Sequence, residues 1–167
     1  MVESKDLRLI VFGVGSETFV LDIMAVRQII PYTGSTRIPT APEFIEGIIV
    51  LRNEVIPIVD LRQRLYPHLA QRAEQPLVLI TRFSGGIIGL KVDEVRRIVT
   101  VSSDALLAPP PIIRGVSGDL LVGVVPVGDE VHLLIDVESI LTTQEKKELR
   151  EADLGEAAQS QSRTAAE

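Results

Sequence analysis

The sequence predicts a mostly β protein made of two similar small barrels, and three observations support this fold class. Apolar residues make up 46% of the chain but aromatic residues only 4%, so the apolar content is mainly Val, Ile and Leu. Val and Ile favour the pleated, half-buried surface of a sheet. Short apolar runs are interrupted by Gly, Asn, Asp or Pro, which is the pattern of hairpins. The chain also repeats itself, which indicates two copies of one unit.

The internal repeat consists of two blocks that occur twice in the same order. A shift of 69 positions places residues 9–30 on residues 78–99. A shift of 76 positions then places residues 47–65 on residues 123–141. The difference between the two shifts (76 − 69 = 7) predicts an extra loop in the second half, and residues 102–111 are its natural place.

Each half is expected to contain five short strands. Those of the first half are expected near residues 7–14, 17–23, 26–33, 47–51 and 55–60, and those of the second half near residues 76–83, 87–92, 96–102, 121–127 and 131–136. Five short strands favour a small closed barrel, because closure removes the exposed strand edges. We therefore expect subdomain 1 at about residues 7–66 and subdomain 2 at about residues 76–141, packed side by side.

Four short helices are expected between and after the strands. Pro42 and Gly47 would begin and end a single turn at residues 41–47, and Asp60 with Gln63 has the N-cap and N3 spacing of a second helix. Asp136 begins a parallel third helix, and Thr142 with Glu145 opens a polar C-terminal helix at about residues 143–154. Residues 155–167 are small and polar and are expected to be disordered.

Composition excludes several classes of function. The chain has no cysteine, which excludes disulfides, thiolate chemistry and cysteine-based metal sites. A formal net charge of −6 with scattered basic residues argues against binding to nucleic acid. The opening residues lack the apolar core of a signal peptide, and no apolar run approaches the roughly 18 residues that span a bilayer. We expect a cytoplasmic protein that does not insert into the membrane.

Catalytic chemistry is not visible in the sequence. Asp60 and Asp136 each stand where a strand meets a helix, so capping explains them better than catalysis. His68 and His132 lie in different segments with no cysteine near them, which makes a weak case for a metal. The glycine turns of the hairpins do not precede a helix, as a phosphate-binding loop would. The sequence therefore predicts no catalytic residue, no metal and no cofactor.

Arg52 is the residue that these structural roles do not explain. It lies with Asn53 at the tip between the fourth and fifth expected strands, where the second copy has Gly128 and Asp129. Asn tolerates the positive φ of such a turn, and glycine fills the place of Arg52 in the other copy. Two interpretations remain open: a solvated surface arginine, or a planar hydrogen-bond donor presented to a protein partner.

Four motifs in order resemble the CheW family of chemotaxis coupling proteins. They are "FGVGSETFVLDIMAVRQII", "RIPTAPEFIEGIIVLRNEVIPIVDLRQRL", "GLKVDEVRRIV" and "LLVGVVPVGDEVHLLIDVESIL", which together cover roughly residues 8–141. The resemblance implies two five-stranded SH3-like barrels and no enzymatic activity. It also implies an adaptor in receptor arrays, which bridges the CheW-like regulatory domain of a CheA-type histidine kinase to the cytoplasmic tip of chemoreceptors.

Motif position in the family gives a set of expected partner contacts. They are Arg52, Asn53 and Glu54 at the tip, Val26, Ile29 and Ile30 on the third strand, and Pro39, Ala41 and Pro42 before the tip; core packing competes with contact for the apolar ones. The family usually has "NLRG" at the tip, and Asn53 here replaces the glycine. This departure leaves open which kinase and receptor are served, and a chemosensory pathway that does not control swimming is an alternative.

Two further alternatives concern the class of protein. A CheW-like part of a CheV-type or kinase-type architecture would carry a receiver sequence or a kinase ATP motif, and the chain has neither. A small-molecule-binding or hydrolytic double barrel would need convergent polar groups, which the sequence does not show. We therefore expect a separate binding adaptor.

Overall fold

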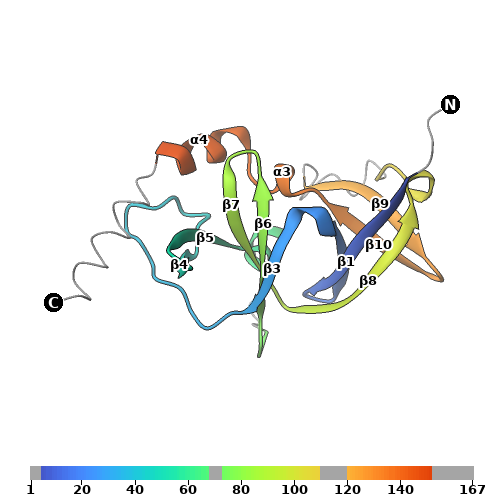
Figure 1. Cartoon of the computed structure of the whole chain (residues 1–167), viewed down its shortest axis with the longest axis horizontal. Helices are drawn as coiled ribbons and strands as arrows, with labels where there is room; N and C mark the ends of the chain where they lie inside the picture. Colours follow the sequence, from blue (N-terminus) through green and yellow to red (C-terminus); the bar gives the residue numbers. More distant parts are fainter. Residues whose placement is uncertain (1–4, 68–72, 110–119, 152–167) are drawn as a thin grey trace.

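The computed structural model describes residues 5–67, 73–109 and 120–151, and they form two five-stranded sheets (Figure 1). In spatial order, the first sheet contains β8 (Glu94–Ser102), β1 (Asp6–Val14), β2 (Glu17–Asp22), β10 (Glu130–Ile135) and β9 (Leu121–Val127). The second contains β3 (Val26–Pro31), β6 (Leu77–Phe83), β7 (Gly86–Val92), β5 (Glu54–Asp60) and β4 (Gly47–Leu51). We call these sheets barrel A and barrel B. The predicted fold class, mostly β with two five-stranded units, is confirmed.

The two halves of the sequence exchange strands. Barrel B contains β3 to β7 in one continuous stretch, whereas β1 and β2 join β8 to β10 in barrel A. Replacing each strand of one half by its equivalent in the other half converts the strand order of barrel A into that of barrel B. The subdomain boundaries of 7–66 and 76–141 must therefore be corrected. The chain passes to barrel B between β2 and β3, and back between β7 and β8, so each barrel takes strands from both copies.

Among the described residues, a single bridge closes each barrel. In barrel B the Thr36 and Ile48 backbones exchange two hydrogen bonds of 2.8 Å, and in barrel A Leu107 and Val124 do the same at 2.8 and 2.9 Å. Both bridges join the chain that follows one edge strand to the opposite edge strand. Twelve positions separate the bridged residues in barrel B and 17 in barrel A, so most of the extra loop follows Leu107.

Apolar side chains form three clusters that match this architecture. A small cluster fills barrel A around Leu9, Val11 and Val125, and the corresponding cluster fills barrel B around Ile58 and Val78. The largest cluster contains residues of both barrels and of the short helices. Because the largest apolar cluster lies between the barrels, burial of apolar surface holds them together as one unit.

The short helices lie at the ends of strands. The structure contains the 3-10 turns η1 (Ile23–Ala25) and η2 (Ser103–Ala105) and the helices α1 (Leu61–Leu65), α3 (Val137–Ile140) and α4 (Thr143–Glu151). The predicted caps are present: the Asp60 carboxylate accepts from the Arg62 amide at 2.9 Å, and the Asp136 carboxylate accepts from the Glu138 amide at 3.2 Å.

One expected helix is replaced by a turn. Residues 41–47 contain a turn in which the Ile45 amide donates to the Pro42 carbonyl at 3.0 Å. The Glu46 amide then donates to the Ile58 carbonyl at 2.9 Å, so the chain becomes extended toward β4 before a helical turn can form. The expected disordered tail at residues 155–167 and His68 lie outside the described residues.

Candidate functional site

The hairpin tip between β4 and β5 is the first part of the candidate site. Arg52 and Asn53 are its two turn residues, and both have positive φ, at 49° and 66°. Leu51 and Glu54 pair directly behind them. Positive φ at both central residues is the geometry that matches the twist of a two-residue hairpin. Arg52, Asn53 and Glu54 are all exposed, as expected for a contact surface.

An ion pair connects β3 to this tip. The Arg27 guanidinium donates to the Glu54 carboxylate at 2.6 Å, and both side chains are partly exposed. Surface pairs of this kind contribute little to stability, about 0–1 kcal/mol. Their effect here is to neutralise Glu54, whereas Arg52 has no ion-pair or hydrogen-bond partner in the described part of the chain. The tip therefore presents one uncompensated cation.

Apolar side chains near the tip divide into exposed and packed ones. Val50 is 60% exposed and lies opposite Val55, one step behind the tip, and Ile29 on β3 is 40% exposed. Val26 packs instead against the cluster between the barrels, and Ile30 packs against the cluster inside barrel B. Of the three expected apolar contacts on β3, Ile29 alone is exposed.

The remaining expected contacts lie away from the tip. Pro39, Ala41 and Pro42 precede β4, whose whole length separates them from Arg52. Ala41 packs against the cluster between the barrels, and the Pro42 carbonyl is bonded within its turn. The structure thus does not bring these three residues together with the tip.

A hollow of about 530 Å³ runs along the closure of barrel B. It is bordered by residues 33–36, which follow β3, and by residues 48–50 of β4. We call it the seam hollow. Gly34 has a φ of 109°, and the space around its α-carbon is open. The seam hollow ends next to the tip, because Val50 borders both.

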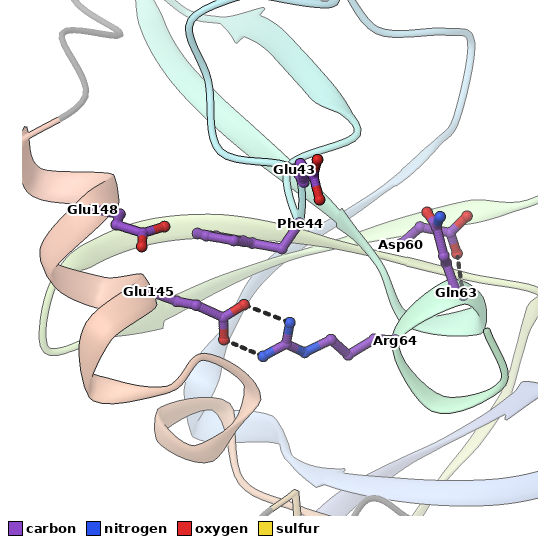
Figure 2. Close-up of a pocket in the computed structure, with 7 residues that line it drawn as sticks. All are labelled: Glu43, Phe44, Asp60, Gln63, Arg64, Glu145 and Glu148. Atoms are coloured by element: carbon purple, nitrogen blue, oxygen red, sulfur yellow. Dashed lines mark hydrogen bonds and ion pairs between the residues drawn. The ribbon is translucent and has the colours of Figure 1, made fainter.

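A second hollow, of about 540 Å³, lies under α4 (Figure 2). It is lined by Glu43, Phe44, Asp60, Gln63, Arg64, Glu145 and Glu148. In Figure 2 the Arg64 guanidinium reaches from α1 to the Glu145 carboxylate on α4 through two hydrogen bonds, one of them 2.6 Å long. This pair attaches the C-terminal helix to the first half of the chain.

Glu145 has a second role in the same place. The Thr142 hydroxyl accepts from the Glu145 amide at 3.0 Å, and the Glu145 carboxylate accepts from the Thr142 amide at 2.9 Å, which is a capping box. Burial alone would raise the pKa of the Glu145 carboxyl, but hydrogen bonds from Arg64 and Thr142 outweigh it, and the pKa lies below its ordinary value. The second hollow is thus built around a structural ion pair.

Among the residues that the structure describes, the acidic and histidine side chains do not form a catalytic or metal-binding arrangement. Asp60 uses its carboxylate to cap α1. His132 is 1% exposed inside barrel A, away from both hollows. Within the described ranges, no group of three or more His, Cys, Asp or Glu side chains could hold a metal ion. No helix among the described residues is long and apolar enough to cross a membrane.

Three parts of the candidate site could not be identified from sequence motifs alone. Arg27 aligns with Arg96 in the repeat, but nothing in the sequence pairs it with Glu54. Val50 and Val55 follow the strand alternation, which does not tell an exposed position from a covered one. Residues 33–36 look like an ordinary loop, and their position beside β4 depends on the closure of barrel B.

Comparison with known proteins agrees on one family. The CheW-like domain family matches residues 8–145. The chain is 32% identical to a chemotaxis protein CheW of Rhizobium meliloti over 139 residues, 83% of this chain and 90% of that protein. It is 29% identical to a CheW of Treponema pallidum over 152 residues, 89% of each chain. The crystal structure of the scaffolding protein TtCheW from Thermoanaerobacter tengcongensis has a TM-score of 0.76 and 27% identity, and the match covers 84% of this chain and 96% of that one.

Proposed function

Because the chain belongs to the CheW-like family of chemotaxis scaffold proteins, we propose that it is an adaptor coupling chemoreceptors to a CheA-type histidine kinase. The proteins of this family are scaffolds and not enzymes. The adaptor would bind the regulatory domain of the kinase and the cytoplasmic tip of the receptors. It would act in the cytoplasm, recruited to receptor arrays, with no cofactor and no segment in the membrane.

The observation that carries the proposal is the conformation of Arg52. A side chain in the left-handed region costs energy that glycine avoids, and the second copy of the hairpin has Gly128 at this position with a φ of 61°. Folding alone would favour glycine here. An exposed guanidinium at a strained position is better explained by what it contacts, since strained residues concentrate at functional sites.

The surroundings of Arg52 suit recognition by another protein. The two-residue turn fixes the direction in which the Arg52 side chain leaves the backbone, and Asn53 and Glu54 place further polar groups next to it. Val50 on β4 and Ile29 on β3 supply exposed apolar surface. Arginine beside apolar side chains is a common composition at the centre of protein interfaces.

A co-sedimentation experiment tests the adaptor function. Membranes that contain the receptors of the source cell are mixed with the purified CheA-type kinase, with and without this chain, and the kinase in the pellet is measured. We expect the kinase to sediment with the membranes to a much greater extent when the chain is present. A pellet with unchanged kinase, together with no binding of the chain to either component alone, would contradict the proposal.

A further inference from the structure

Barrel B has an open strand edge at Val50, beside the seam hollow. Along an antiparallel strand, successive residues direct their N–H and C=O groups to opposite sides. Ile48 directs both groups away from β5: its N–H donates to the Thr36 carbonyl and its carbonyl accepts from the Thr36 N–H. Pro57, which lies opposite Ile48 on β5, has no N–H to offer. Val50 is two residues further along β4, so its N–H and C=O point to the same outer side as those of Ile48.

The described part of the chain does not pair with this edge. The closure of barrel B is one bridge long and ends at Thr36. The next residue in register would be Gly34, but its φ of 109° takes the chain out of the extended conformation. The seam hollow occupies the space between this segment and Val50. Unpaired N–H and C=O groups on a strand edge are a template for another strand.

The second copy of the hairpin blocks the equivalent edge. Pro126 pairs with Val131 on β9 and β10 in the same way as Val50 pairs with Val55 on β4 and β5. Proline has no N–H, and natural sheets use it to protect their edges. The two barrels therefore differ at this position of the edge strand: Pro126 protects the edge of barrel A, whereas Val50 leaves the edge of barrel B open.

The charges around the open edge indicate what could pair with it. Arg37 follows Thr36 at one end of the seam hollow, and Arg52 lies beyond Val50 at the other end. Both arginines are exposed, and neither has an ion-pair partner among the described residues. This cationic rim stands out in a chain with a net charge of −6, and carboxylates would complement it.

We propose that the Val50 edge binds an extended segment of a partner protein, which adds a strand to barrel B. The segment would be apolar at alternate positions, facing Val50 and Val55, and would carry acidic residues that meet Arg37 and Arg52. In strand addition, main-chain hydrogen bonds provide affinity and the flanking side chains provide specificity. This mode of binding rests on the proposed adaptor function, which supplies the partner.

Amide hydrogen exchange at Val50 tests strand addition directly. The probes are the regulatory domain of the CheA-type kinase and a fragment of the receptor tip. We expect the Val50 amide to exchange quickly in the free chain and to be protected in the complex that adds the strand.

Two substitutions at Val50 separate the backbone from the side chain. Val50→Pro removes the N–H, as Pro126 does in barrel A, and we expect binding to weaken roughly three- to tenfold through the lost hydrogen bond. Val50→Ala keeps the N–H, so its complex should still protect the amide of residue 50. The matched control is Pro126→Val, which opens the equivalent edge of barrel A and should leave the affinity unchanged.

Each outcome decides between the proposals. Protection of the Val50 amide by either probe, with weaker binding of Val50→Pro, supports strand addition. A probe that binds Val50→Pro with parental affinity and leaves the parental Val50 amide unprotected overturns strand addition but leaves the adaptor function standing. If neither probe binds the parent chain, the adaptor function fails and strand addition falls with it. If circular dichroism shows that Val50→Pro does not fold, amide hydrogen exchange at Val50 in the parent chain decides whether strand addition occurs.

Discussion

Arg52 and Gly128 have the same left-handed backbone conformation at equivalent hairpin tips, with φ of 49° and 61°. The second central residue differs, because Asn53 has positive φ whereas Asp129 does not. The first hairpin therefore places two side chains in a region where glycine is favoured. Asn tolerates this region better than most residues, so the strain is concentrated at Arg52.

Replacement of Arg52 by glycine should stabilise the fold. We expect Arg52→Gly to raise the free energy of unfolding by about 0.5–1 kcal/mol, because relief of the left-handed strain outweighs the greater freedom of the unfolded chain. Chemical denaturation measures the change. Asn53→Gly is the matched control and should gain less. A clear loss of stability in Arg52→Gly would mean that the arginine side chain contributes to folding.

His132 is a buried imidazole without a hydrogen bond. Its two ring nitrogens have no hydrogen-bond partner in the described part of the chain, and Nε2 lies 3.7 Å from the Glu130 carboxylate. Burial lowers the pKa of His132 below its ordinary value; Arg97 and Arg96 act in the same direction, while Glu130 and the backbone of Val131 oppose them. The equivalent position in barrel B is Ile56, which is 1% exposed.

The presence of a buried histidine in barrel A, where barrel B has Ile56, predicts how the stability of the fold depends on pH. Because the pKa of His132 is lowered in the folded chain, the unfolded chain binds the proton more tightly than the folded chain does. The neutral imidazole is compatible with the fold above about pH 6.5, and the free energy of unfolding decreases as the pH falls below that value. His132→Ile should remove this part of the pH dependence. It should also raise the unfolding free energy by about 1–2 kcal/mol, because no polar group is left unpaired.

Thermal melts between pH 5 and 7.5 compare the parent chain with His132→Ile. The reciprocal change, Ile56→His, should destabilise barrel B and add pH dependence of the same sign. Parallel stability curves for the parent and His132→Ile would show that His132 is not responsible.

The attachment of α4 predicts a second stability effect. Glu145→Gln weakens both the Arg64 pair and the capping box, and we expect a loss of about 1 kcal/mol at neutral pH. Because the pKa of Glu145 is lowered in the folded chain, its contribution is present above about pH 4.3 and is lost as the pH falls through the folded-state pKa. Glu148→Gln is the control, since within the described ranges Glu148 has only a 3.4 Å hydrogen bond from Gln144. Equal losses in the two variants would show that the Arg64 pair contributes nothing.

The sequence located the ten strands and three of the four expected helices, but it did not assign the strands to barrels. Alternation and turn residues located the ten strands, and the Asp60 and Asp136 caps follow from short-range hydrogen-bond chemistry. The pairing of the strands could not be predicted in this way, because β1 pairs with β8, which lies far from it in the sequence. Two copies of similar sequence can form two barrels with or without exchange, and the periodicity is the same in both cases.

In the candidate site, too, the local features could be predicted from the sequence and the long-range contacts could not. The exposure of Arg52 at a tip was predictable, since the turn and its flanking strands are adjacent in the sequence. The pairing of Arg27 with Glu54 was not, because β3 and the β4–β5 tip meet only when barrel B closes. The open edge at Val50 depends on that closure too, although the contrast between Val50 and Pro126 can be read from the repeat once the register is known.

The final prediction separates folding from recognition at Arg52. In Arg52→Glu the exposed side chain changes charge, and exposed substitutions usually change stability within about ±0.5 kcal/mol. At an interface, the same change removes the donors and places like charges together, which costs on the order of 2–5 kcal/mol if the contact is buried. Binding would therefore weaken roughly thirty-fold to several-thousand-fold. Isothermal titration against the kinase regulatory domain and a receptor-tip fragment, beside a thermal melt, measures both quantities.

The equivalent tip of barrel A provides the control for this experiment. Asp129→Lys also reverses a charge on an exposed hairpin turn, but no arginine stands at that tip and Gly128 precedes the substituted residue. We expect Asp129→Lys to keep parental affinity for both partners. If Arg52→Glu melts like the parent and binds both partners like the parent, Arg52 is a solvated surface residue, and the partner contact has to be sought elsewhere on barrel B.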